Sequence, residues 1–172
     1  EMKKYISVIL VCLICLTLAS CKKTYKGIDK LSEKAKEELP VSYGESSDMR
    51  YAGMCTVDDK ALAWFIFGNE YQSRYYLPME VKIIGEEEYS YVCTYKPIDD
   101  RTEDIALLYW ENGYAFIVNN QKCSSVKIID ENITHEEKIE KETYPYVFYY
   151  HPLTLPKTIE YVFLDFYGNE LR

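Results

Sequence analysis

Histidine and glycine are scarce in this sequence, and neither residue type forms a recognisable functional motif. The 172 residues include two histidines, His135 and His151, and seven glycines. The two histidines do not form a short metal-binding motif such as His-x-x-x-His. The sequence contains no glycine-rich phosphate loop, no nucleophile elbow and no dinucleotide-binding fingerprint. We therefore predict no catalytic residue, no metal ligand and no cofactor, and we expect that the protein is not an enzyme.

Positive charge is also scarce outside the N-terminal part of the chain. Residues 50–172 contain 12 Lys and Arg against 21 Asp and Glu, a net charge of −9, whereas residues 21–49 contain six of each sign. A surface with this charge repels phosphate backbones and anionic lipid surfaces. We therefore expect no nucleic-acid partner, and only Lys22, Lys23 and Lys26 are placed to contact lipid headgroups.

The N-terminus has the organisation of an export signal. Lys3 and Lys4 precede an apolar run from Tyr5 to Leu18. This run is shorter than the roughly 20 apolar residues that a membrane-spanning helix requires. A basic flank, a short apolar core and small residues at its end are typical of a segment that is removed on export. We predict that residues 1–20 form a cleaved signal peptide.

The end of this segment, Leu18-Ala19-Ser20-Cys21, resembles the lipobox of bacterial lipoproteins. The resemblance implies cleavage between Ser20 and Cys21, a diacylglyceryl group on the Cys21 sulfur, and acylation of the new amino group. Each buried methylene contributes about 0.8 kcal/mol, and stable anchoring needs at least two acyl chains. The expected location is a cell membrane, inner or outer, with the protein lipid-anchored and facing outside the cytoplasm.

Three cysteines remain once the signal peptide and the lipidated residue are set aside: Cys55, Cys93 and Cys123. Because this number is odd, at most one intramolecular disulfide can form among them. We expect most of them to be buried as free thiols. A Cys55–Cys93 or a Cys93–Cys123 disulfide is the alternative in an oxidising compartment.

Residues 21–49 are expected to form a lipidated polar tether followed by one short helix. An apolar stripe with spacings of three and four consists of Ile28, Leu31, Ala35 and Leu39. This spacing places the four side chains on one helical face, and Pro40 ends the pattern. We expect the helix to pack on its own domain or to act as a spacer, with partner binding as the alternative.

Residues 50–172 have the patterns of a globular β domain. Residues 61–67 are apolar on both faces, as in a central strand, and residues 79–83 alternate between apolar and charged. Asn112-Gly113 lies between two apolar segments and predicts a tight hairpin, since both residues tolerate positive φ. Residues 131–143 are highly charged and predict a long loop or one helical turn. About eight or nine strands are expected in all.

The expected fold is mainly β, an antiparallel β-sandwich or barrel-like sheet with one short N-terminal helix. The closing residues 159–171, IEYVFLDFYGNEL, resemble the last strand of bacterial immunoglobulin-like modules. That resemblance implies an immunoglobulin-like form of the sandwich. The alternative is an α+β fold in which the helix packs on a meandering antiparallel sheet.

Tyrosine is unusually abundant, and 15 of the 18 tyrosines lie in residues 50–172. Tyrosine suits cross-strand packing, and its ring and hydroxyl also suit contacts with a sugar or a protein. We favour packing for most of them. The candidate binding patch consists of Tyr75, Tyr76, Tyr149 and Tyr150. Along residues 89–95, strand alternation predicts that Tyr89, Tyr91, Cys93 and Tyr95 share one face.

These features predict a membrane-anchored bacterial lipoprotein that displays a small binding domain for an envelope protein or a cell-wall glycan. The alternative is an envelope hydrolase that acts through paired carboxylates or through Cys123, with His151 as a candidate base. An exposed aromatic surface would favour the binding domain. Two carboxylates that face each other in a pocket would favour the hydrolase.

Overall fold

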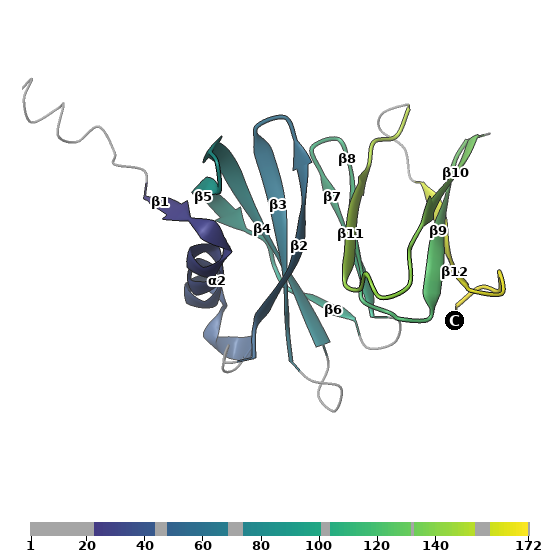
Figure 1. Ribbon diagram of the computed structural model, residues 1–172, viewed down its shortest axis with the longest axis horizontal. Helices are drawn as coiled ribbons and strands as arrows, with labels where there is room; N and C mark the ends of the chain where they lie inside the picture. The colour runs from purple at the N-terminus through teal and green to yellow at the C-terminus, as the bar shows by residue number, and fades with distance from the viewer. Residues whose placement is uncertain are drawn as a thin grey trace, which may run out of the picture.

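The computed structural model describes residues 23–43, 48–68, 74–100, 104–131, 133–153 and 159–171. The predicted signal peptide and lipidation site, Ser20 and Cys21 included, lie outside these residues. The described chain is mainly β, with one α-helix and twelve strands arranged in three antiparallel sheets. Figure 1 shows four layers along the longest axis of the molecule, first the helix and then the three sheets. The predicted mainly β, sandwich-like fold with one short helix is confirmed.

The first sheet is buried on both faces around its central strands. Its order is β1 (Thr24–Lys26), β5 (Glu88–Thr94), β4 (Arg74–Gly85), β3 (Lys60–Phe67) and β2 (Arg50–Val57), with β6 (Ile98–Asp100) paired to the other end of β4. Successive side chains of a strand point to opposite faces. In β3, Phe65 therefore packs toward the helix and Trp64 toward the second sheet, and neither is exposed. The prediction of a central strand at residues 61–67 is confirmed.

Helix α2 (Gly27–Glu38) covers one face of the first sheet (Figure 1). Leu31 and Ala35, from the predicted apolar stripe, are completely buried there, and Tyr25 of β1 joins the same cluster. Leu39 has an extended backbone conformation before Pro40, which restricts the residue preceding it and so ends the helix. A short 3₁₀ helix, η1 (Val41–Tyr43), follows.

The segment expected to form a tether and a helix is therefore packed with the β domain. Strand β1 pairs with β5 along its whole length, and the backbone N–H of Gly27 donates to the carbonyl of Glu87 at 2.8 Å. The helix packs on its own domain, as we expected from the sequence. Among the residues that the structure describes, no helix is long and apolar enough to cross a membrane.

The second and third sheets complete the stack. The second has the order β11 (Tyr146–Tyr150), β8 (Gly113–Val118) and β7 (Ile105–Trp110), and the third has the order β10 (Ile133–Lys138), β9 (Cys123–Asp130) and β12 (Glu160–Asp165). In β8, Ala115 and Ile117 face the first sheet, whereas Phe116 and Val118 face the third. The second sheet therefore supplies side chains to two separate cores.

Strand β10 corrects the prediction of a loop or helical turn at residues 131–143. Residues 133–138 pair with β9 at the outer edge of the third sheet, and most of their side chains are exposed. Because neither face of this strand is buried, no apolar alternation marks it in the sequence. Its hydrogen bonds to β9 define it, and charged side chains are common on such edge strands.

The prediction that Tyr89, Tyr91, Cys93 and Tyr95 share one face is wrong. The register between β4 and β5 shifts at Val92, which forms a β-bulge. Tyr89 and Tyr91 therefore pack in the core beneath helix α2, whereas Tyr95 packs against the core between the first two sheets. The extra residue reverses the alternation on which the prediction depended.

The hairpin predicted at Asn112-Gly113 is confirmed, but its glycine has a different role. Positive φ falls on Glu111 (46°) and Asn112 (60°), and Gly113 is the first residue of β8. A Cβ at Gly113 would lie 2.5 Å from the carbonyl oxygen of Tyr150 and closer still to the ring of Tyr149. Glycine is therefore required at this position by the close approach of β11.

Candidate functional site

Tyr75 and Tyr76, from the predicted binding patch, lie on opposite faces of β4. Tyr76 has no exposed surface and belongs to the core between the first two sheets. Tyr75 packs on the helix side, where its ring centroid lies 5.2 Å from those of both Tyr43 and Phe67. The prediction that Tyr76 forms part of a surface patch is wrong, because consecutive residues of a strand cannot share a face.

Tyr149 and Tyr150 are half-buried and also point to opposite faces, here of β11. The hydroxyl of Tyr149 donates to the carbonyl of Glu111 at 2.6 Å. The hydroxyl of Tyr150 donates to the carboxylate of Asp130 at 3.4 Å. Tyr149 packs against the core between the first two sheets, and Tyr150 against the core between the second and third. The structure therefore does not bring the four predicted residues together on one surface.

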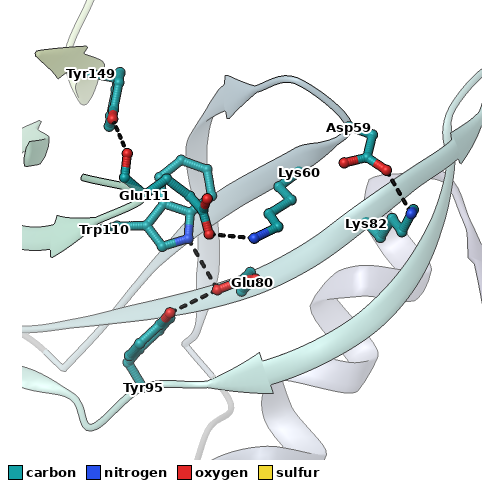
Figure 2. Close-up of polar contacts among 8 residues, drawn as sticks. All are labelled: Asp59, Lys60, Glu80, Lys82, Tyr95, Trp110, Glu111 and Tyr149. Atoms are coloured by element: carbon teal, nitrogen blue, oxygen red, sulfur yellow. Dashed lines mark hydrogen bonds and ion pairs between the residues drawn. The ribbon is translucent and has the colours of Figure 1, made fainter. Parts of the chain in front are cut away.

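A buried carboxylate lies between the first two sheets (Figure 2). Glu80 of β4 is only 7% exposed. Its Oε2 atom accepts hydrogen bonds from the hydroxyl of Tyr95 at 2.7 Å and from Nε1 of Trp110 at 3.0 Å. Burial, followed by the hydrogen bond to Glu80, raises the pKa of Tyr95, so its hydroxyl stays protonated and remains the donor. These bonds offset the loss of hydration of the carboxylate and join the first sheet to β7.

Two ion pairs lie close to this carboxylate (Figure 2). Lys60 contacts Glu111 at 2.5 Å, and Lys82 contacts Asp59 at 2.6 Å. The hydrogen bond to Glu111 raises the pKa of Lys60, and the negative charge of Glu80 acts in the same direction. Both pairs are open to solvent, so screening keeps their contribution to stability small. The contacts of Glu80 with Trp110 and of Lys60 with Glu111 form a polar clamp between the first two sheets, whereas the Asp59–Lys82 pair lies within the first sheet.

The three cysteines of the β domain are free thiols, and Cys55 and Cys123 are buried. The burial expected for most of them is thus confirmed. Cys55 and Cys93 lie in one cross-strand row of the first sheet, on β2 and β5 with two strands between them. Three strand spacings amount to about 14 Å, which is beyond the reach of a disulfide. This spacing rules out the alternative of a Cys55–Cys93 disulfide, and the alternative Cys93–Cys123 disulfide is not formed either, since both thiols are free.

Cys123 does not have the environment of a nucleophile. Its side chain is fully buried, and its thiol donates to the carbonyl of Ser125 at 3.4 Å. Burial raises the pKa of Cys123 to about 11, so the reactive thiolate is rare at neutral pH. His151, the candidate base, is exposed, and its Nδ1 atom lies 3.5 Å from the hydroxyl of Tyr149. Within the described ranges, no group of three or more His, Cys, Asp and Glu residues is arranged to hold a metal ion.

An open cavity of about 410 Å³ lies at the end of the molecule formed by the third sheet. We call it the aromatic cavity. Its lining residues come from the turns that follow β8, β10 and β12, and they are Gln121, Lys141, Glu142, Tyr144 and Phe166. Phe166 is 42% exposed, and the ammonium group of Lys141 lies 4.8 Å from its ring centroid. The hydroxyl of Tyr144 donates to the carbonyl of Cys123, which holds that ring in place.

The turn that presents Phe166 is held by the carboxylate of Asp165. This carboxylate accepts hydrogen bonds from the backbone N–H groups of Tyr167 and Asn169, both at 2.8 Å, and from the side-chain amide of Asn169. The hydrogen bonds from Asn169 lower the pKa of Asp165. Gly168 supplies the φ of 80° that the turn needs. Tyr167 is 90% exposed, so this turn presents a second aromatic side chain to solvent.

Sequence reasoning did not identify the aromatic cavity. The available signal was Phe166-Tyr167, two consecutive aromatic residues directly before a Gly-Asn turn, where one of the pair is left outside the core. The other lining residues come from turns that are distant in the sequence. Only the packing of the third sheet brings these turns together.

Comparison of the chain with protein-family models, with curated proteins and with solved structures found no match. The function is therefore inferred from the residues and the geometry described above.

Proposed function

We propose that this chain is a bacterial lipoprotein, anchored through Cys21 to a cell membrane, whose β domain binds an envelope protein or a cell-wall glycan outside the cytoplasm. The lipobox-like residues Leu18–Cys21 support the anchor. The aromatic cavity is the observation that carries the binding role. Concave sites that combine aromatic surface with a few polar groups are the usual form of ligand sites in proteins.

The position of the cavity supports a partner that is not a lipid of the anchoring membrane. Strand β1 begins at Thr24, three residues after Cys21, and three extended residues span at most about 11 Å. The end of the domain that carries β1 and α2 would therefore lie close to the membrane. The third sheet lies at the opposite end of the long axis (Figure 1), so the aromatic cavity would lie far from the bilayer.

The charge of the domain also argues against a lipid partner in the anchoring membrane. Residues 50–172 have a net charge of −9, which disfavours close approach to an anionic membrane surface. The hydrolase alternative has weaker support, because Glu80 is already bonded to two donors and the Cys123 thiol is buried with a raised pKa. We therefore propose a binding role without catalysis.

Replacing Cys21 with alanine is expected to abolish the incorporation of labelled fatty acid and labelled glycerol. The alanine side chain has no sulfur to receive the diacylglyceryl group, so the anchor cannot form. The measurement is metabolic labelling of cells, followed by purification and gel analysis. Cys15→Ala, at a cysteine within the apolar run, is the matched control and should label as the wild type does. Labelling of Cys21→Ala at the wild-type level would contradict the proposed anchor.

Photo-cross-linking in cells tests the binding role independently of the anchor. A photoreactive amino acid at the exposed position 167, next in sequence to Phe166 of the aromatic cavity, is expected to form covalent adducts with a partner. The same amino acid at position 86, in the exposed β4–β5 turn, is the control and should form few adducts. Adducts from position 167 support the binding role whether the captured partner is a protein or a glycan. Equal yields from both positions, or none from either, would count against it.

A further inference from the structure

We propose that the aromatic cavity binds the sugar rings of an uncharged, acetamido-bearing oligosaccharide, with one ring stacked on Phe166. This inference rests on the binding role proposed above and specifies its ligand class. The volume of about 410 Å³ falls within the range of about 300–1,000 Å³ that is usual for ligand sites. The lining is mixed, with aromatic rings beside an amide, a carboxylate and an ammonium group.

The aromatic groups match the apolar face of a sugar ring. Phe166 is exposed over two-fifths of its surface, and Tyr144 lies in the same lining. In the free protein the Lys141 ammonium occupies one side of the Phe166 ring at 4.8 Å. A sugar that stacks on that side takes the place of the ammonium, and the flexible lysine side chain is then free to donate a hydrogen bond to the ligand.

The polar groups match an acetamido substituent. An acetamido group offers one N–H donor and one carbonyl acceptor. The Glu142 carboxylate accepts hydrogen bonds, the Lys141 ammonium donates them, and the Gln121 amide does both. One positive and one negative side chain leave the lining close to neutral, which favours an uncharged ligand over a strongly charged one.

The aromatic part of the site is also preorganised. Asp165 holds the turn of Phe166 through backbone hydrogen bonds, and the hydroxyl of Tyr144 is bonded to the carbonyl of Cys123. Groups held in place before binding lose little conformational entropy when a ligand arrives. Tyr167, the next residue in this turn, is not part of the lining but is 90% exposed, so its ring is available to a second sugar of a longer ligand. The inferred ligand is therefore an oligosaccharide with at least two rings.

The test is calorimetric titration of the full-length protein in lipid nanodiscs with N-acetylglucosamine and its trimer. The wild type is expected to bind the trimer more tightly than the monosaccharide. Phe166→Ala should weaken trimer binding by about 10-fold, the size expected for loss of a central aromatic contact, while Phe166→Tyr retains it. Gln121→Ala should weaken the binding of both sugars, and Tyr167→Ala should weaken the binding of the trimer only. Tyr109→Ala, at an exposed tyrosine of β7, is the control and should leave binding unchanged.

The modes of failure are distinguishable. If the trimer does not bind while position 167 still cross-links to a protein in cells, the sugar inference is overturned and the binding role stands. If neither binding nor cross-linking occurs, both are overturned. If the trimer binds equally to the wild type, Phe166→Ala and Gln121→Ala, the aromatic cavity is not the sugar site. Circular dichroism of each variant confirms that the fold is intact.

Discussion

Replacing Gly113 with alanine is expected to lower the free energy of unfolding by about 3 kcal/mol. The new Cβ would lie 2.5 Å from the carbonyl oxygen of Tyr150 and closer still to the ring of Tyr149. Overpacking of this kind costs about 1–3 kcal/mol. Relief requires the Tyr149 ring to move, which breaks its 2.6 Å hydrogen bond to the Glu111 carbonyl and costs about 1 kcal/mol more. The measurement is urea-induced unfolding of the purified protein.

Gly85→Ala is the matched control for this substitution. Gly85 also lies at the end of a strand, but the atoms nearest to a Cβ added there belong to the flexible side chain of Glu88, at 3.2 Å. This variant should be neutral or stabilised by a few tenths of a kcal/mol, because alanine reduces the entropy of the unfolded chain. The double variant Gly113→Ala with Tyr149→Leu should lose less free energy of unfolding than the sum of the losses in the two single variants. Equal stability of the two alanine variants would contradict the close-approach argument.

Replacing Glu80 with leucine is expected to destabilise the protein by about 2–4 kcal/mol. The carboxylate accepts hydrogen bonds from Tyr95 and Trp110, and leucine leaves both donors without this acceptor. A buried donor left unsatisfied costs about 1–3 kcal/mol. The larger share should come from Trp110, which is only 3% exposed, since water can reach the half-buried Tyr95 more easily. Glu80→Gln keeps an accepting oxygen, so its free energy of unfolding should fall by about half as much.

A double-mutant cycle distinguishes the hydrogen bond between Glu80 and Trp110 from a general loss of packing at position 80. Trp110→Phe removes the indole N–H that donates to Glu80. The substitution should therefore lower the free energy of unfolding less in the Glu80→Leu background than in the wild type. Glu86→Leu, in an exposed turn, is the control and should change stability by less than about 0.5 kcal/mol. The free energies come from the same urea titrations. Strict additivity of Glu80→Leu and Trp110→Phe would show that the two side chains are not coupled.

The sequence predicted best where one physical effect dominated a segment. The apolar stripe from Ile28 to Leu39 predicted helix α2, because burial of one face is the main determinant of a surface helix. The apolar run at residues 61–67 predicted a central strand for the same reason. Both elements are buried as expected, and the mainly β class follows from the strand patterns that surround them.

The sequence failed where a neighbouring strand, and not local composition, determined the outcome. Strand β10 is charged and exposed, and only its pairing with β9 makes it a strand. The bulge at Val92 turns Tyr91 and Tyr95 to opposite faces, although strict alternation would keep them together. Gly113 has the sequence signature of a turn glycine, but its role is to admit the ring of Tyr149.

By itself, the sequence determined the mainly β class, the N-terminal helix and the expectation of a lipid anchor, because each depends on a local pattern of apolar, small or charged residues. Only the tertiary structure decided which tyrosines are buried, which carboxylate joins two sheets, and which turns meet around Phe166. These features depend on the register of strands far apart in the chain. A shift of one residue in register moves a side chain from one face of a sheet to the other, so local patterns cannot specify such a site.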